Sequence, residues 1–168
     1  MTEKQKQSFA AYVRNFIFGV EDSLVSTAGL LSGIATAGVS RGNILATGVV
    51  LIFVEAFSMA VGSFLSERSA EEYLAQAELP TRRSVGVGSI MFVSYFATGF
   101  IPLFPYLILD VSVAFPASIV ASLVALFILG LVAARVLRIK KTLRSGLRML
   151  VVGGFAIALG VAVGSFVR

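Results

Sequence analysis

The chain has 168 residues, of which 57% are hydrophobic and only 14% are charged, against about a quarter charged in soluble domains. This composition, with a mean hydropathy of +0.93, predicts an integral membrane protein, and the absence of Cys and His excludes disulfides, thiolate or imidazole metal sites and Ser–His or Cys–His nucleophile pairs. The net charge of +5 does not indicate nucleic-acid binding, because the basic residues lie between apolar segments, where they orient helices and meet anionic lipid headgroups.

The chain contains five apolar segments long enough to cross a bilayer as a helix, which takes about 20 residues. After a polar, amphipathic lead-in at residues 1–15, these spans cover approximately residues 16–38, 44–65, 84–109, 113–134 and 147–167. Turn residues separate the first two spans, and a polar connector, residues 66–83, follows the second. We expect this connector to be helical until Pro80. Pro102 and Pro105 should bend the third span. The remaining loops are short, so we expect one all-α transmembrane domain over residues 1–168.

The basic residues are distributed unequally between the two ends of these spans. With the N-terminus in the cytoplasm, the inner side holds Lys4, Lys6, Arg14, Arg68, Arg82, Arg83, Arg135, Arg138, Lys140, Lys141, Arg144 and Arg148. The outer side then holds only Arg41 and Arg168. The positive-inside rule therefore predicts an N-in, C-out protein. A cleaved signal peptide is not favoured, because Glu21 and Asp22 interrupt the first apolar segment.

Three carboxylates lie inside the expected spans: Glu21 and Asp22 in the first and Glu55 in the second. A charge at the centre of a span costs about 2.5–3.5 kcal/mol on insertion scales, so intramembrane acids usually face a cavity, a partner or an ion path. No Lys or Arg lies within a span core to neutralise them. We therefore expect these acids to be protonated, hydrated or paired with a mobile metal ion or proton.

Helix geometry places two of the candidate ligands at one depth. Asp22 and Met59 each lie six residues inside the cytoplasmic boundary of their span, about 9 Å along a helix. Glu55 lies on the same face as Met59, about 6 Å deeper. Oxygen ligands with one thioether suit a first-row divalent ion such as Fe²⁺ or Mn²⁺. Gly29 and Gly33 share a face with Asp22 and form a GxxxG pair for close helix packing.

Simpler interpretations of these residues remain open. Met59 could only fill a gap in the packing, and Glu55 could be a neutral acid hydrogen-bonded to a neighbouring hydroxyl. Four acids of the connector could collect cations at the cytoplasmic mouth, or could form a solvated helix face balanced by Arg68. These four are Glu67, Glu71, Glu72 and Glu78.

Three motifs in order resemble the vacuolar iron transporter family, which includes the nodulin-21-like proteins: FGVEDSLVSTAGLLSGIATAG, EAFSMAVGSFLSERSAEEY and ATGFIPLFPYLI. The resemblance implies a five-helix homodimer that exchanges Fe²⁺, in some members Mn²⁺, for protons and moves the metal out of the cytosol. It assigns the pathway aspartate to Asp22 and the methionine of the second span to Met59. The metal is the cargo, and no permanently bound cofactor is implied.

The sequence departs from the family pattern in three places. Related vacuolar members have an acidic residue where this chain has Leu51, and we expect Glu55, one turn further along, to replace it. Many bacterial relatives have a carboxylate at the position of Ser63. The long cytoplasmic metal-binding insert of the vacuolar members is missing, since only residues 66–83 separate the second and third spans.

Taken together, these patterns predict a transporter in which Asp22 and Met59 of two protomers line a path at the dimer axis. Asp22 and Glu55 would couple metal to protons, and Glu21 would be a further metal ligand. The expected location is the plasma membrane of a prokaryote or a vacuolar-type membrane of a eukaryote. An uncoupled channel, a carrier for another small cation and a structural membrane protein remain alternatives. An enzyme is not expected, because no nucleophile–base set is visible.

Overall fold

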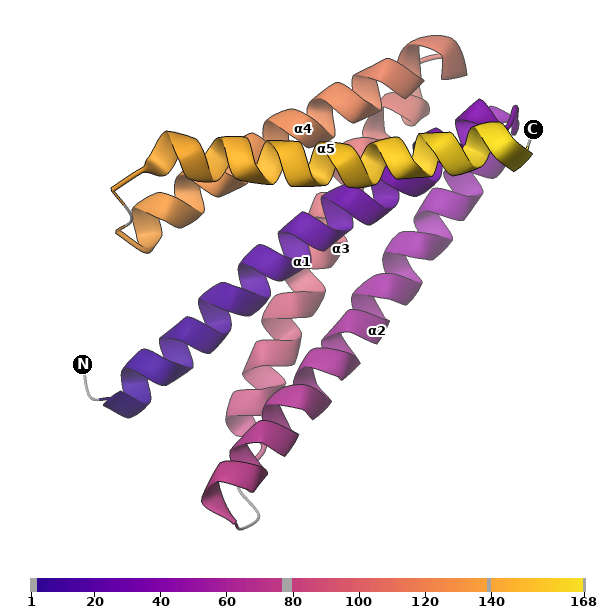
Figure 1. Cartoon of the computed structure of the whole chain (residues 1–168). Helices are drawn as coiled ribbons and strands as arrows, with labels where there is room; N and C mark the ends of the chain where they lie inside the picture. Colours follow the sequence, from indigo (N-terminus) through magenta and orange to yellow (C-terminus); the bar gives the residue numbers. More distant parts are fainter. Residues whose placement is uncertain (1–2, 77–79, 139, 168) are drawn as a thin grey trace.

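The computed structural model describes residues 3–76, 80–138 and 140–167, and over these ranges it consists of helices without a strand. The helices are α1 (Glu3–Thr36), α2 (Arg41–Ala75), α3 (Arg82–Ile108), α4 (Val111–Val136) and α5 (Thr142–Val167) (Figure 1). All five are long and apolar enough to cross a membrane. The prediction of an all-α protein with five spans is therefore confirmed.

Two helices extend well beyond the apolar spans. The polar lead-in is already helical from Glu3, so α1 enters the membrane as a continuous helix. In the same way α2 continues into the connector as far as Ala75. The expected helix stop at Pro80 is wrong by several residues, because Gln76 adopts a left-handed conformation (φ 50°) and caps the helix before the proline is reached.

The helix ends alternate between two ends of the molecule. The N-terminal residues, the α2–α3 connection and the α4–α5 connection lie at one end, which we call the basic end because it carries most of the Lys and Arg residues (Figure 1). The C-terminus lies at the opposite end with the α1–α2 and α3–α4 turns. At this opposite end, Arg41 Nε donates to the Tyr106 carbonyl oxygen at 2.7 Å. Arg41 thereby satisfies a carbonyl that the last turn of α3 leaves without a helical partner.

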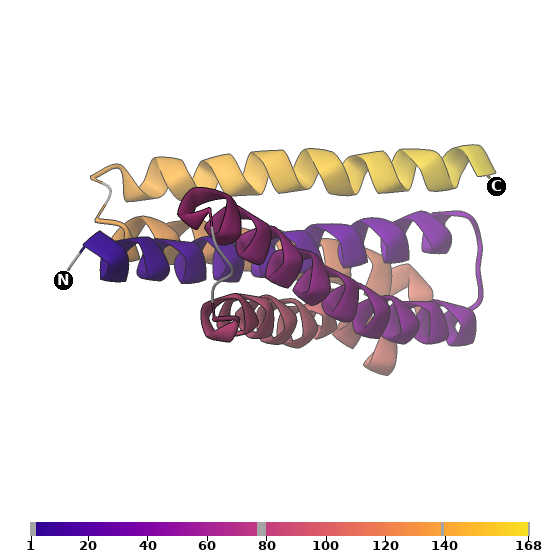
Figure 2. The ribbon, with the colours of Figure 1, turned by 90° about the horizontal axis from the view of Figure 1, so that it is seen from below.

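Helix α1 is the central element of the fold. It contacts all four other helices, and α3 packs against both α1 and α2. Figure 2 shows α1 between α5 and the α2–α3 pair. Apolar clusters fix these contacts: Leu24 of α1 packs with Leu126 of α4, and Leu31 of α1 packs with Leu103 of α3. Most of the α2 surface faces outward and is apolar, as contact with lipid or another apolar surface requires.

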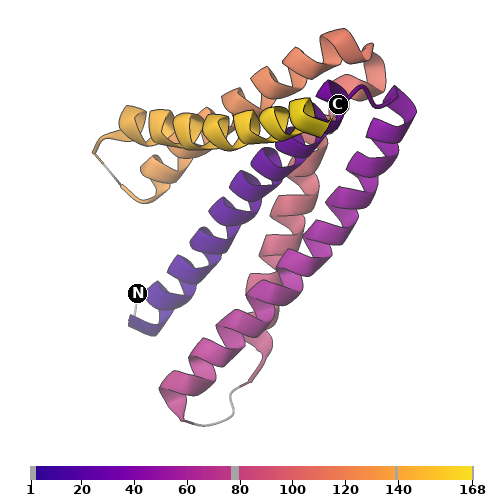
Figure 3. The ribbon, with the colours of Figure 1, turned by 45° about the vertical axis from the view of Figure 1, so that its right-hand side comes forward.

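The contact between α1 and α5 is made by glycines. A Cβ atom added to Gly33 would lie 2.7 Å from the carbonyl oxygen of Gly160, and one added to Gly164 would overlap the backbone of Gly33. The two backbones therefore touch without intervening side chains, as in small-xxx-small packing. The helices diverge from this crossing toward the basic end (Figures 1 and 3). The close contacts of α5 therefore lie along the C-terminal half of α1.

Candidate metal pathway

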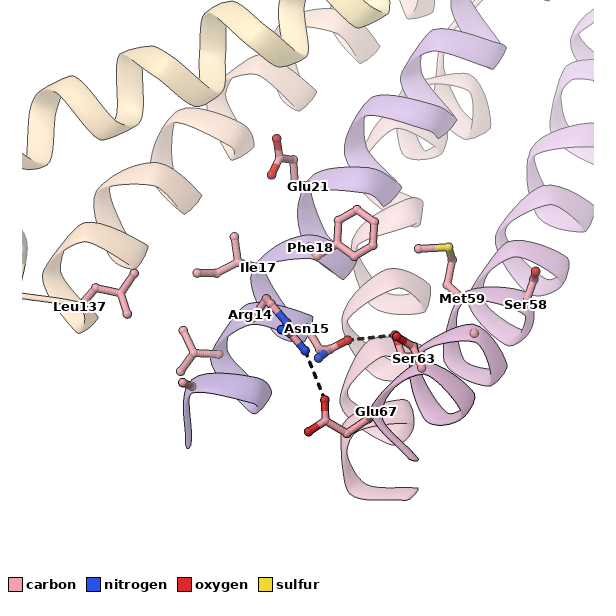
Figure 4. A pocket seen from close by; sticks show the side chains of 14 residues that line it. Arg14, Asn15, Ile17, Phe18, Glu21, Ser58, Met59, Ser63, Glu67 and Leu137 are labelled. Atoms are coloured by element: carbon pink, nitrogen blue, oxygen red, sulfur yellow. Dashed lines mark hydrogen bonds and ion pairs between the residues drawn. The ribbon is translucent and has the colours of Figure 1, made fainter. Parts of the chain in front are cut away.

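A cavity of about 940 Å³ lies beside the N-terminal half of α1 (Figure 4). Its walls come from α1, from α2 and from Leu137 at the end of α4, with no contribution from α5. Two of the expected metal ligands, Glu21 and Met59, line this cavity together. In Figure 4 the ring of Phe18 lies between them. A carboxylate of α1 and a thioether of α2 thus face one space between these two helices.

An ion-pair network closes the cavity toward the basic end. Glu67, which is 7% exposed, accepts hydrogen bonds from Arg14 at 3.2 Å and from Arg83 at 2.7 Å. Deeper in the cavity, the Ser63 hydroxyl donates to Asn15 Oδ1 at 2.9 Å (Figure 4). These contacts connect α1, α2 and α3. Ser63 therefore contributes a neutral hydrogen bond at this position.

Asp22 and Glu55 lie within electrostatic range of each other, further from the basic end. Both side chains are half-buried, and they lie close enough for their charges to interact across α1 and α2, with Glu21 also within range of Asp22. Neither Asp22 nor Glu55 is among the residues that line the cavity. Glu21 and Met59 thus share the cavity, and Asp22 and Glu55 lie within electrostatic range of each other outside its lining.

Hydroxyl groups of α1 and α3 form hydrogen bonds near these two acids. Tyr95 of α3 is fully buried, and its hydroxyl lies 2.7 Å from the Ser26 hydroxyl. The Ser23 hydroxyl donates to the Tyr95 carbonyl oxygen at 2.7 Å. Tyr95 is also within electrostatic range of Asp22 and Glu55. The phenol therefore joins α1 to α3 directly beside the two carboxylates.

The acids of the connector are neutralised by arginines. Glu71 pairs with Arg83 at 3.0 Å and accepts a hydrogen bond from the Ser84 hydroxyl at 3.2 Å. Glu72 pairs with Arg68 at 2.8 Å, one turn away on the same helix. Together with Glu67, these acids form an arginine-balanced cluster at the basic end. Glu78 lies outside the described residues.

The comparison with protein families decides the relationship. A model of the VIT family matches residues 13–87 and 76–165, which together span most of the chain. The chain belongs to the VIT family. The resemblance to the vacuolar iron transporters is therefore confirmed. No curated protein matches the chain.

Membership of the VIT family makes this chain a multi-pass membrane protein of a metal-ion transport family rather than of an enzyme family. Within residues 3–76, 80–138 and 140–167, no three acidic side chains gather into a group that could hold a metal ion. In this VIT-family protein, Asp22 and Glu55 lie within electrostatic range of each other, and Glu21 and Met59 line the adjacent cavity. A full coordination shell for a divalent ion needs further ligands from water or from another chain.

Sequence reasoning missed three residues of this region. Tyr95 has a visible signal, because a tyrosine in the middle of an apolar span needs a partner for its hydroxyl. Asn15 likewise stands at the start of an apolar span and binds Ser63 across the helices. Arg83 counts in the sequence only as one of the basic residues that indicate orientation, whereas in the structure it bridges Glu67 and Glu71. Only the helix crossing brings these partners together.

Proposed function

We propose that this chain exports Fe²⁺, or Mn²⁺, from the cytosol in exchange for protons, with the basic end in the cytoplasm. The proximity of Asp22 and Glu55 is the observation that carries the proposal. No Lys or Arg occurs between Arg14 and Arg41 in α1, or between Arg41 and Arg68 in α2. Two neighbouring carboxylates without a fixed cation attract a mobile one. Protons and a divalent metal compete for such a pair, and this competition couples their movements.

The cavity supports an approach to this pair from the basic end. An ion that passes the Arg14–Glu67 ion pair meets the Glu21 carboxylate and the Met59 thioether in the same space. A soft sulfur ligand beside oxygen ligands favours Fe²⁺ over harder ions such as Mg²⁺ or Ca²⁺. We therefore place initial selection at Glu21 and Met59 and proton exchange at Asp22 and Glu55.

A second copy of the chain would complete the coordination. The described residues of one chain do not bring three acidic side chains together into a group that could hold a metal ion. The cavity lies beside α2, and the outer face of α2 is apolar. This face of α2 includes Phe53, Val54, Phe57 and Val61, all at least 39% exposed, with Phe57 the most exposed at 66%. In a homodimer formed across α1 and α2, the two cavities would face each other and double the number of ligands.

Transport by the purified protein in proteoliposomes tests the proposal. With Fe²⁺ kept reduced, we expect uptake to depend on an imposed pH gradient and to be accompanied by proton counterflow. Asp22→Asn should lower the rates of Fe²⁺ uptake and of proton counterflow at least tenfold, because a neutral amide offers no negative charge to a metal ion and has no proton to exchange. The matched control is Asp110→Asn, an exposed aspartate at the N-cap of α4 where Asn is equally suitable.

The outcomes separate the competing functions. Equal uptake by Asp22→Asn and by the unmodified chain would contradict the assigned role of the acidic pair. Metal uptake that ignores the pH gradient would indicate an uncoupled channel or carrier. A structural membrane protein would show no metal flux in any variant, while replacement of the acids would change its oligomeric state.

A further inference from the structure

The connection between α4 and α5 concentrates positive charge. Residues 135–148 include the basic side chains Arg135, Arg138, Lys140, Lys141, Arg144 and Arg148, and every one of them is exposed. The sequence contains no Asp or Glu after Asp110. This connection therefore has no acidic residue of its own to balance the charge.

Three of the other four arginines at the basic end, all except Arg82, are different. Arg14, Arg68 and Arg83 are paired with the glutamates of α2. Within the described ranges, none of the six basic side chains of the α4–α5 connection forms an ion pair. Their counter-charge must therefore come from outside the chain.

A hollow of about 760 Å³ lies within this connection. Lys140, Lys141, Arg144 and Arg148 line it, together with Ser145, Leu147 and Val151 of α5. Four cationic side chains and a hydroxyl thus surround one space, while two apolar side chains form its wall toward the spans. Such an arrangement suits an anion that is attached to an apolar group.

The face of α5 below the hollow is apolar and uncovered. Arg144, Arg148, Val151 and Phe155 follow one another at helical spacing on the same side of α5. Val151 is 63% exposed and Phe155 is 70% exposed. No charged residue occurs between Arg148 and Arg168, so Arg148 marks the boundary between the headgroup layer and the hydrocarbon.

We propose that the α4–α5 connection is a binding site for one anionic phospholipid. Its phosphate occupies the hollow between Lys140, Lys141, Arg144 and Arg148, and an acyl chain lies along Val151 and Phe155 of α5. Charge complementarity selects an anionic headgroup over a zwitterionic one, since each basic side chain near an anionic surface strengthens binding by about fivefold. The apolar stripe adds contacts that free phosphate cannot make.

Native mass spectrometry of the intact protein in detergent tests this site. Phosphatidylglycerol and phosphatidylcholine with identical acyl chains are titrated separately, and the bound lipids are counted. We expect phosphatidylglycerol to bind at least tenfold more tightly. The double variant Arg144→Gln/Arg148→Gln should lose at least tenfold of this affinity, while its weak binding of phosphatidylcholine stays unchanged.

The matched control removes the same number of charges at the same end of the molecule. Arg68→Gln/Arg82→Gln should change phosphatidylglycerol affinity less than twofold. Equal losses in the two double variants, or equal binding of the two lipids by the unmodified chain, would overturn the proposal. Displacement of phosphatidylglycerol by an equal concentration of inorganic phosphate would also overturn it, because the site would then bind a free anion. If the first variant does not fold, Lys140→Gln/Lys141→Gln is measured instead, and we expect the same loss of phosphatidylglycerol affinity.

Discussion

The two halves of α1 meet their neighbours through different chemistry. The N-terminal part as far as Asp22, which we call the polar half, carries Arg14, Asn15, Glu21 and Asp22, and its contacts include ion pairs and hydrogen bonds around a cavity. The C-terminal half packs its glycines backbone to backbone on α5. One continuous helix thus has a polar half that lines an open space and a glycine half that has no room for a methyl group at Gly33.

We expect this difference to separate substitutions that lower stability from substitutions that alter transport. Inside a bilayer apolar surface is not expelled from water, so close contact between small residues becomes a main source of helix association. Buried carboxylates, in contrast, are costly to the fold and are retained where they bind something. We therefore expect substitutions in the glycine half to affect folding most, and substitutions in the polar half to leave a folded protein with altered transport.

The largest effect is expected at the glycine contact. In Gly164→Ala the new methyl group would overlap the carbonyl oxygen, carbonyl carbon and Cα of Gly33. Backbone atoms cannot move aside as side chains do, so the loss of stability should reach about 3 kcal/mol. Unfolding in a denaturing detergent measures it. Gly42→Ala is the control, since nothing lies within 4 Å of its added Cβ, and a similar loss there would break the comparison.

A smaller effect is expected at the ion-pair network. Glu67→Gln removes a buried charge that binds both Arg14 and Arg83. Since Arg14 is 72% exposed, most of the effect comes from Arg83, and we expect a loss of about 1–2 kcal/mol. The control Glu72→Gln breaks a helical pair in which both side chains are about one-third exposed, which should cost about 0.3–0.5 kcal/mol. Equal unfolding midpoints for the two variants would contradict this ranking.

The next effect is expected at the link between α1 and α3. Tyr95→Phe removes the hydroxyl that contacts Ser26 at 2.7 Å and should cost about 1 kcal/mol, since Ser26 loses its partner. The folded protein should persist, so metal uptake can be measured on the same sample. Tyr73→Phe, at a side chain that is 76% exposed, should leave stability and uptake unchanged. A loss as large as that of Gly164→Ala would show that the polar half also determines folding.

The smallest effect is expected inside the cavity. Ser63→Ala removes one hydrogen bond to Asn15, while the Asn15 amide group still donates to the Ala11 carbonyl oxygen at 2.9 Å. We expect a loss of about 0.5 kcal/mol. Ser58→Ala, at an exposed position of the same cavity wall, provides the matched hydroxyl deletion. A difference above about 1.5 kcal/mol between the two variants would contradict the expectation.

Much of the fold could be predicted from the sequence, whereas the site could be predicted only in part. Five apolar runs predicted five helices, because the bilayer leaves a single chain segment few other ways to satisfy its backbone. The helix stop was placed too late at Pro80, since the left-handed Gln76 leaves no strong sequence signal. Glu21, Asp22, Glu55 and Met59 could be named as candidates from the sequence, but only the packing of α1 against α2 shows that Glu21 and Met59 line one cavity and that Glu55 acts on Asp22.

The sequence alone determined the membrane class, the five helices and the presence of acids without neighbouring cations. Hydropathy and local charge depend on residues that are close together in the chain, so they can be read without the tertiary structure. The tertiary structure decided which of these groups meet. Arg14 and Glu67 are separated by 53 residues, and their contact depends on the angle at which α1 and α2 pass each other. The cavity has the same origin: its lining residues in α1 and α2 lie far apart in the sequence, and only the packing of these helices brings them to one space.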